Sequence, residues 1–183
     1  VTETLVEVIR SWDQAPNVVV SGSAVGFYGD QGSATVTEST SPNDEFTHRL
    51  CRDWENAAKP LADDGVRVCF SRTGVVAGPD GGFLERMILP FKLGLGGRLG
   101  SGKQFMPWVH RDDVVGALIW MMENPSASGP FNVVSPNPAT NAEFTRSLGK
   151  VLHRPTLFPA PAPVLKIALG EMARLLLTGQ KAV

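Results

Sequence analysis

The stretch NVVVSGSAVGFYGD, which runs from Asn17 to Asp30, decides how this chain is expected to fold. Three consecutive valines end abruptly in Ser21-Gly22-Ser23, and a glycine-spaced loop follows that contains Tyr28, the only tyrosine of the chain. A short apolar run of β-branched residues is typical of a buried strand. The stretch therefore predicts a strand that delivers hydroxyl groups at its carboxyl end.

The neighbouring segments alternate between helical and strand patterns. Residues 1–12 and 44–65 carry apolar residues at helical spacing, and residues 66–79 read VRVCFSRTGVVAGP, a second apolar strand that breaks at Gly74. Continuous apolar strands alternating with helices predict an α/β architecture, with a parallel sheet and helices on both of its faces. The apolar positions expected to face inward are Leu5, Val8, Ile9 and Trp12 in the first helix, and Phe46, Leu50, Trp54, Ala57 and Leu61 in the second.

The pattern changes after Pro79. A short helix leads into a glycine-rich loop, and RDDVVGALIWMMEN then predicts a helix capped by Asp112 or Asp113. GPFNVVSP predicts a short strand, and Thr140-x-x-Glu143 is a capping-box pattern that opens another helix. A proline-rich connector and a last amphipathic helix follow.

Composition excludes several classes of function. The net charge of −1 provides no basic field for nucleic acid. Two cysteines and three scattered histidines give neither a disulfide framework nor the spacing of a metal site, and a reducing cytoplasm is the default location. The most apolar stretch, near the end, is interrupted by Lys166, Glu171 and Arg174 and is too short to span a bilayer. We expect a cytoplasmic protein without metal, nucleic acid or membrane partners.

Two strand ends are the first candidates for a site. In open α/β sheets, ligands bind beyond the carboxyl ends of the strands. Gly22 and Gly74 would let a flat ligand approach the backbone, and Ser23 would donate a hydrogen bond to it. Serine and glycine also simply terminate strands, so both interpretations stay open at this point.

The loop GLGGRLGSGKQ, residues 94–104, invites comparison with a phosphate-binding loop. It lacks the G-x-x-x-x-G-K-[ST] spacing, because Gln104 follows Lys103. A flexible lid or substrate loop is favoured instead. Within it, Arg98 either meets an anionic group or is a solvated surface residue.

The segment MPWVHRDD gathers Trp108, His110 and two aspartates. A Ser-His-Asp hydrolase would need Ser23 as its nucleophile, but the sequence around Ser23 lacks the G-x-S-x-G elbow. A hydrogen-bonded structural role beside a capped helix is therefore favoured for His110.

Together these segments resemble a known superfamily. VVVSGSAVGFYGD, SRTGVVAGP, WVHRDDVV and GPFNVVS are similar to motifs of the extended short-chain dehydrogenases/reductases of the NAD-dependent epimerase/dehydratase type. LCRDWENAA and PFKLGLGGRLGSGKQFMPWVHRDD are similar to its atypical branch called epimerase family protein. The resemblance implies part of a Rossmann-like, doubly wound parallel sheet. Residues 1–79 would form the carboxyl-terminal half of the cofactor domain, and residues 80–183 a small α/β substrate lobe, with interleaving possible.

The resemblance also implies a site. The cofactor would be NADP(H) or NAD(H), and Ser23 matches the family's catalytic serine. Tyr28 matches the tyrosine of its Y-G pair and is the only phenol able to relay a proton. The cofactor-binding residues would be Ser21, Gly22, Ser23, Gly74, Val75 and Val76, and the substrate-binding residues Arg98, Trp108 and His110.

Two departures from the family pattern qualify these expectations. The glycine fingerprint G-x-x-G-x-x-G after a first strand is absent, so the cofactor site is incomplete and the chain resembles the carboxyl-terminal part of a longer protein. The Tyr-x-x-x-Lys pair is also absent, because its positions hold either Thr47 and Cys51 or Phe46 and Leu50.

The expected function follows from both the matches and the departures. It is an NAD(P)-dependent epimerase-like oxidoreductase, with a nucleoside-diphosphate sugar or a similar small polar molecule as the expected substrate. The alternative is a cofactor-binding regulatory or scaffold protein without turnover. The expected partners are the amino-terminal half of the same protein and a second copy of the chain.

Overall fold

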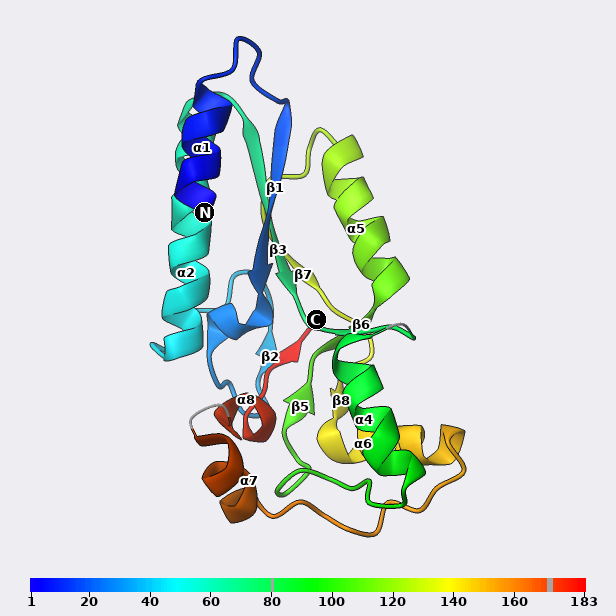
Figure 1. Cartoon of the computed structure of the whole chain (residues 1–183). Coiled ribbons are helices and arrows are strands. Elements are labelled where there is room, and N and C mark those ends of the chain that lie inside the picture. The colour runs from blue at the N-terminus through cyan, green and yellow to red at the C-terminus, as the bar shows by residue number, and fades with distance from the viewer. Residues whose placement is uncertain (80, 171–172) are drawn as a thin grey trace.

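The computed structural model describes residues 1–79, 81–170 and 173–183. Its centre is a three-stranded parallel sheet with the strand order β1-β3-β7 (Figure 1). The strands are β1 (Val18–Ala24), β3 (Arg67–Thr73) and β7 (Gly129–Val133). Val18 pairs with Arg67 and Ala24 with Thr73, so the carboxyl ends of β1 and β3 are level. The parallel α/β sheet predicted from the apolar runs is confirmed.

Helices cover both faces of this sheet (Figure 1). Three helices lie on one face: α1 (Thr2–Arg10), α2 (Phe46–Ala58) and α3 (Pro60–Asp63). Helix α5 (Arg111–Glu123) lies on the other. Because side chains alternate along a strand, Val68 and Phe70 pack with α1 and α3, whereas Cys69 packs with Met121 of α5. Two apolar layers therefore hold the sheet between its helices.

The helix faces differ from the prediction. In α1, Ile9 is buried as expected, whereas Leu5 and Val8, and Trp12 just after the helix, are exposed. In α2, Phe46, Leu50 and Trp54 of the expected apolar stripe are exposed, whereas Leu61 in α3 is buried as expected. The side chains of α2 that face inward are His48, Cys51, Glu55 and Ala58. This face is buried because His48 and Glu55 find hydrogen-bond partners on the segments beneath it.

A second group of short elements lies beyond the carboxyl ends of the sheet strands (Figure 1). Its strand pairs are β4 (Val75–Ala77) with β6 (Trp108–His110), β5 (Phe105–Met106) with β8 (Ala139–Thr140), and β2 (Thr35–Val36) with β9 (Lys181–Ala182). The remaining elements are η1 (Val25–Tyr28), α4 (Gly82–Lys92), α6 (Asn141–Val151), α7 (Ala162–Leu169) and α8 (Ala173–Leu177).

Two of these features bear on the sequence predictions. The capping box at α6 is confirmed, because Thr140 and Glu143 exchange their hydrogen bonds. The predicted cap of α5 is wrong: the N-cap is His110, whose Nδ1 accepts a hydrogen bond from the Asp112 backbone N–H. Asp112 and Asp113 instead occupy the first turn, where their negative charges interact favourably with the positive end of the helix dipole.

Strand β7 and helix α5 come from the second half of the chain but complete the layers of the sheet. The division at residue 79 stays a prediction. The predicted last helix includes residues 171 and 172, which lie outside the described residues; α7 and α8 flank them. Among the residues that the structure describes, no helix is both long enough and apolar enough to cross a membrane.

Candidate active site

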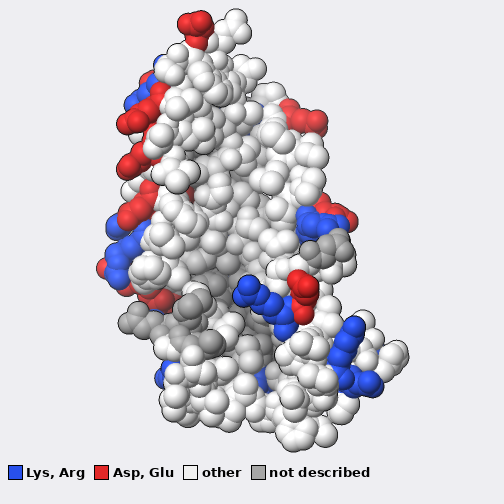
Figure 2. Space-filling model, in the orientation of Figure 1, with Lys and Arg blue, Asp and Glu red and all other residues white. Residues whose placement is uncertain are grey.

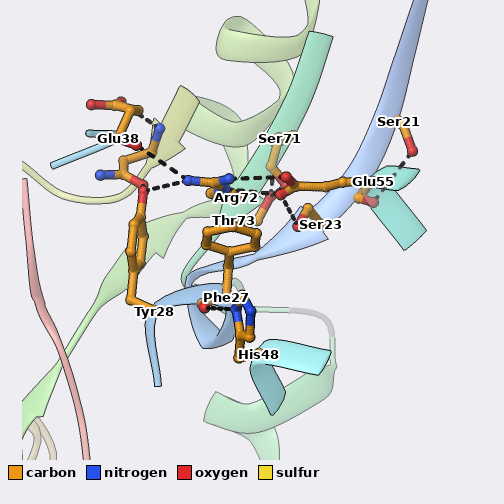
Figure 3. A network of polar contacts seen from close by, with 12 residues as sticks. Ser21, Ser23, Phe27, Tyr28, Glu38, His48, Glu55, Ser71, Arg72 and Thr73 are labelled. Carbon is orange, nitrogen blue, oxygen red and sulfur yellow. Dashed lines mark hydrogen bonds and ion pairs between the residues drawn. The ribbon is translucent and has the colours of Figure 1, made fainter. Parts of the chain in front are cut away.

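Ser23 lies near the carboxyl end of β1, where its side chain turns toward α2 (Figure 3). Its hydroxyl donates a 2.8 Å hydrogen bond to Glu55 Oε1, and the residue is only 8% exposed. Strand β1 and helix α2 therefore meet through a polar contact at the end of the sheet where parallel α/β folds bind ligands.

Glu55 and Arg72 form a buried ion pair behind Ser23 (Figure 3). They are 3% and 4% exposed. Arg72 Nε donates to Glu55 Oε1 over 2.8 Å, and Arg72 Nη2 donates to Glu55 Oε2 over 2.9 Å. Burial by itself lowers the pKa of Arg72, but its hydrogen bonds to Glu55 and Tyr28 outweigh burial and raise the pKa above the ordinary value. The guanidinium is therefore charged, and its geometry is the two-bond form that binds carboxylates strongly.

Tyr28 continues the network on the far side of Arg72. Its ring is fully buried, and its hydroxyl donates to Asn132 Oδ1 over 2.7 Å while accepting from Arg72 Nη1 over 3.0 Å. Burial raises the pKa of Tyr28, and the hydrogen bond from Arg72 only partly opposes this. Tyr28 is thus held as a neutral phenol that joins η1 to β3 and β7. Its role as a proton relay stays a prediction.

Two aromatic rings close the network from the side of α2 (Figure 3). Arg72 Cζ lies 3.4 Å from the centre of the Phe27 ring, a cation–π contact. The Nδ1–H of His48 donates to the Phe27 carbonyl oxygen over 2.7 Å, and the two rings meet edge to face. The Phe27 ring therefore covers one face of the guanidinium and keeps water from it.

The two glycines at the strand ends differ in their surroundings. A Cβ atom on Gly22 would meet no atom within 4 Å, so the space beside β1 is open there. A Cβ atom on Gly74 would overlap the Pro107 carbonyl oxygen, which accepts a hydrogen bond from the Val75 N–H. Gly74 therefore serves the packing of one chain segment on another. The open space at Gly22 leaves room for a ligand.

The other residues predicted to bind cofactor lie on either side of these glycines. Ser21 and Gly22 line a groove between the edge of β1 and the helices α1 and α2. Val75 and Val76 belong to β4, where they pair with Trp108 and Val109 of β6. Their roles in cofactor binding stay predictions.

The three predicted substrate-binding residues come from separate elements. The Arg98 side chain is exposed, Trp108 is half-buried in β6, and His110 is the exposed N-cap of α5. Within the described part of the chain, the hydrogen-bond partner of the Ser23 side chain is Glu55 and that of the His110 side chain is the Asp112 N–H. A Ser-His-Asp arrangement on Ser23 and His110 is not formed. Substrate binding by these three residues stays a prediction.

The glycine-rich loop is packed closely against the rest of its lobe, and its role as a lid or substrate loop stays a prediction. A Cβ atom on Gly97 would overlap the Phe158 carbonyl oxygen, and one on Gly96 would overlap the Phe91 ring. The Leu99 N–H donates to the Oδ1 of buried Asn141 over 2.7 Å. The glycines here allow close packing of the loop against the rest of the lobe.

Sequence reasoning missed Glu55 and Arg72. A signal was present, because an arginine inside the apolar strand VCFSR must find a partner when the strand is buried. Glu55 was hidden because the apolar stripe of α2 pointed to the opposite helix face. Within residues 1–79, 81–170 and 173–183, no group of three or more metal-ligating side chains occurs.

Comparisons with known proteins agree with this geometry. Residues 1–135 match the model of the NAD dependent epimerase/dehydratase family, and residues 160–183 match a domain of unknown function, DUF1731. The chain is 44% identical over 172 residues to epimerase family protein Mb2239 of Mycobacterium bovis, covering 93% of this chain and 57% of the relative. It is 41% identical over 185 residues to epimerase family protein SDR39U1 of Bos taurus, covering 100% and 63%. The chain thus spans about three fifths of the length of these curated relatives.

The fold is also similar to solved structures of proteins named as epimerases. The crystal structure of human epimerase family protein SDR39U1 (isoform 2) with NADPH matches with a TM-score of 0.95 and 38% identity, covering 100% of this chain and 62% of the other. The nucleoside-diphosphate sugar epimerase of Corynebacterium glutamicum matches with a TM-score of 0.75 and 35% identity, covering 91% and 37%.

Proposed function

The chain belongs to the NAD-dependent epimerase/dehydratase family, and from this premise we propose that it forms the substrate-facing part of an NADP(H)- or NAD(H)-dependent epimerase or oxidoreductase. The proposed substrate is a nucleoside-diphosphate sugar or a similar small polar molecule. One observation carries the proposal: Ser23 is held by Glu55 at the carboxyl end of a parallel strand, next in sequence to Gly22, whose own side of the strand is open. The NADPH of the human structure and the name of the Corynebacterium protein support it.

The residues present fit a nicotinamide cofactor at one end. The backbone at Gly22 is open to a flat ring, and Ser21 and Ser23 on either side of it in β1 carry hydroxyl groups on the other face of the strand. Val75 and Val76 would line the same end from β4. A bound nicotinamide supplies a hydride acceptor or donor. The chain's own contribution is to orient the ligand at Ser23 and to keep the surrounding network dry.

Two partners belong to this proposal. Within the described residues, the outer edge of β1 pairs with no other strand, and a groove beside it is lined by Val19, Val20 and Trp54. The face over β1, between α1/α2 and α5, is largely uncharged in Figure 2. We propose that the half of the protein that carries the glycine fingerprint pairs there, because an open apolar edge is otherwise a site of aggregation.

The second proposed partner is another copy of the chain. Exposed apolar residues of α1 and α2 outside this groove, Val8, Phe46 and Leu50, support a homodimer through these helices. We place the protein in the cytoplasm, because Cys51 and Cys69 are both unpaired and buried. Analytical ultracentrifugation of the intact protein tests the dimer, and a monomer at micromolar concentration would contradict it.

A direct test compares NADPH binding by this chain alone and by the protein that contains it. Because the glycine fingerprint cradles the pyrophosphate, the chain alone should bind weakly or not at all, whereas the whole protein should bind tightly. Equal and tight binding by both would refute the division of the cofactor site. For turnover, Ser23→Ala should lower kcat/KM by about 10²–10³-fold, and Tyr28→Phe by less.

An alternative function is cofactor binding without turnover, as in a redox sensor or scaffold. It is favoured by Thr47 and Cys51, which stand on α2 where a Tyr-x-x-x-Lys pair would be needed. Burial raises the pKa of Cys51, so its thiol is neutral and is a poor acid–base catalyst near pH 7. Tight NADPH binding with no turnover of any nucleoside-diphosphate sugar tested would favour this alternative.

A further inference from the structure

The hydrogen bond between Ser23 and Glu55 determines which way the Ser23 proton points. We infer that Glu55 is a positioning residue that turns Ser23 into a hydrogen-bond acceptor toward the ligand, so that the ligand group that meets Ser23 carries an O–H or N–H. This inference deepens the proposed function and rests on it. It also changes the sequence-based expectation that Ser23 donates a hydrogen bond to the ligand.

The first step is that Glu55 accepts hydrogen bonds and does not donate them. Both of its oxygens already receive N–H groups of Arg72, at 2.8 Å and 2.9 Å. A guanidinium carries five N–H donors and no acceptor, and it stays protonated in proteins. This two-bond arrangement is the one that a guanidinium forms with a carboxylate, whose oxygens only accept hydrogen bonds. The hydrogen bond between Ser23 and Glu55 therefore takes its proton from the serine.

The second step concerns what remains of the Ser23 hydroxyl. A hydroxyl has one proton and two acceptor lone pairs, and the proton is held by Glu55. The Cys51 thiol next to Ser23 is neutral because burial raises its pKa, and an S–H is only a weak donor. Towards a ligand that reaches it, the Ser23 hydroxyl can therefore offer only its lone pairs.

The third step is that this polarity is fixed by the fold. Glu55 is held by Arg72, and Arg72 is held in turn by Tyr28 and by the Phe27 ring. Turning the Ser23 proton toward a ligand would leave the hydroxyl oxygen facing a buried carboxylate. Such an arrangement is unfavourable in a low-dielectric site. A ligand hydroxyl or amide N–H at Ser23 should therefore bind more tightly than a carbonyl at the same place.

Two ligand groups supply the required donor. One is the carboxamide N–H of the nicotinamide, and the other is a sugar hydroxyl. A titration of the whole protein with two probe pairs distinguishes them. The first pair is NADP⁺ and its 3-acetylpyridine analogue, in which a methyl ketone replaces the carboxamide. The second pair, with NADP⁺ saturating, is UDP-glucuronic acid and UDP-4-deoxy-4-fluoro-glucuronic acid, which lacks the 4-hydroxyl.

For each pair, the preference is the Kd of the donor-free member divided by the Kd of the member with the donor. In one of the two pairs, this preference should be about 3- to 10-fold larger in the wild type than in Ser23→Ala. Glu55→Gln should abolish or invert this preference, because the amide can donate to Ser23 and release its proton toward the ligand. Arg72→Lys is the matched control. It weakens the same ion pair but keeps the Glu55 carboxylate, so the preference should persist.

Ser23→Ala keeps the test valid if Glu55→Gln does not fold. The inference is overturned if neither pair shows a preference that depends on Ser23, if the donor-free member binds more tightly, or if Glu55→Gln keeps the wild-type preference. A wild-type protein that does not bind NADP⁺ at all would overturn the proposed function, and this inference with it. Tight NADP⁺ binding with no preference within either pair would overturn only the inference about Glu55 and Ser23.

Discussion

Removing the Glu55 side chain should destabilise the protein severely. Glu55→Ala takes away both hydrogen bonds to Arg72 and leaves the guanidinium charged at 4% exposure, between the Phe27 ring and Tyr28. It also leaves the Ser23 hydroxyl without its acceptor. Breaking a buried ion pair from one side costs about 3–5 kcal/mol, and an orphaned buried donor adds about 1 kcal/mol or more. Because these effects overlap, we expect a loss of about 4 kcal/mol.

The double replacement Glu55→Met with Arg72→Leu distinguishes the cost of an unpaired buried charge from the cost of lost packing. Apolar side chains of similar volume remove both charges at once, so no unpaired charge remains, and stability should return to within about 2 kcal/mol of the wild type. Urea unfolding, followed by circular dichroism, is measured for the wild type, Glu55→Ala, Glu55→Met, Arg72→Leu and the double variant, and it gives the free energies and the m-values. The reasoning is refuted if Glu55→Ala costs less than about 1 kcal/mol, or if the double variant is as unstable as the sum of the single ones.

Further perturbations test other features of the fold. Gly22→Ala should leave stability unchanged or slightly raised but should weaken NADPH binding. Gly74→Ala should lower the melting temperature, because its Cβ atom would overlap a backbone carbonyl. Equal melting temperatures of the two variants would contradict this. Burial raises the pKa values of Tyr28 and Cys51 above their ordinary values of 10.0 and 9.0. As the pH rises, the unfolded chain therefore loses these two protons before the folded chain does. The urea concentration at the midpoint of unfolding should then fall as the pH rises above about 9. Tyr28→Phe should flatten the part of this decline above about pH 10, and an unchanged slope would count against it. Arg67→Ala should cost about 1–3 kcal/mol, because the guanidinium donates to three carbonyls at and just beyond the end of α5, and faster amide exchange there would be the readout.

The sheet was predictable and the network behind Ser23 was not. A continuous apolar run such as Val18–Val20 predicts a parallel strand, because helices cover both faces of such a strand. On α2, periodicity identifies an apolar stripe but not which side of the helix faces the core. Phe46 and its neighbours were expected inside, whereas Glu55 lies there because its partner, Arg72, comes from another strand. A pairing between separate elements leaves little trace in either local pattern.

The small pair of strands β2 and β9 has a consequence for the order of folding. Val36 is paired with Ala182, and the Val183 carbonyl oxygen accepts a hydrogen bond from Asn132, the partner of Tyr28. The pairing of β1 with β3 needs far less chain between the two strands. Because closing a longer loop costs more entropy, the sheet should form first and the region around Tyr28 last. During synthesis, the contacts of Asn132 with Tyr28 and Val183 would then form only after the segment at residues 181–183 has left the ribosome.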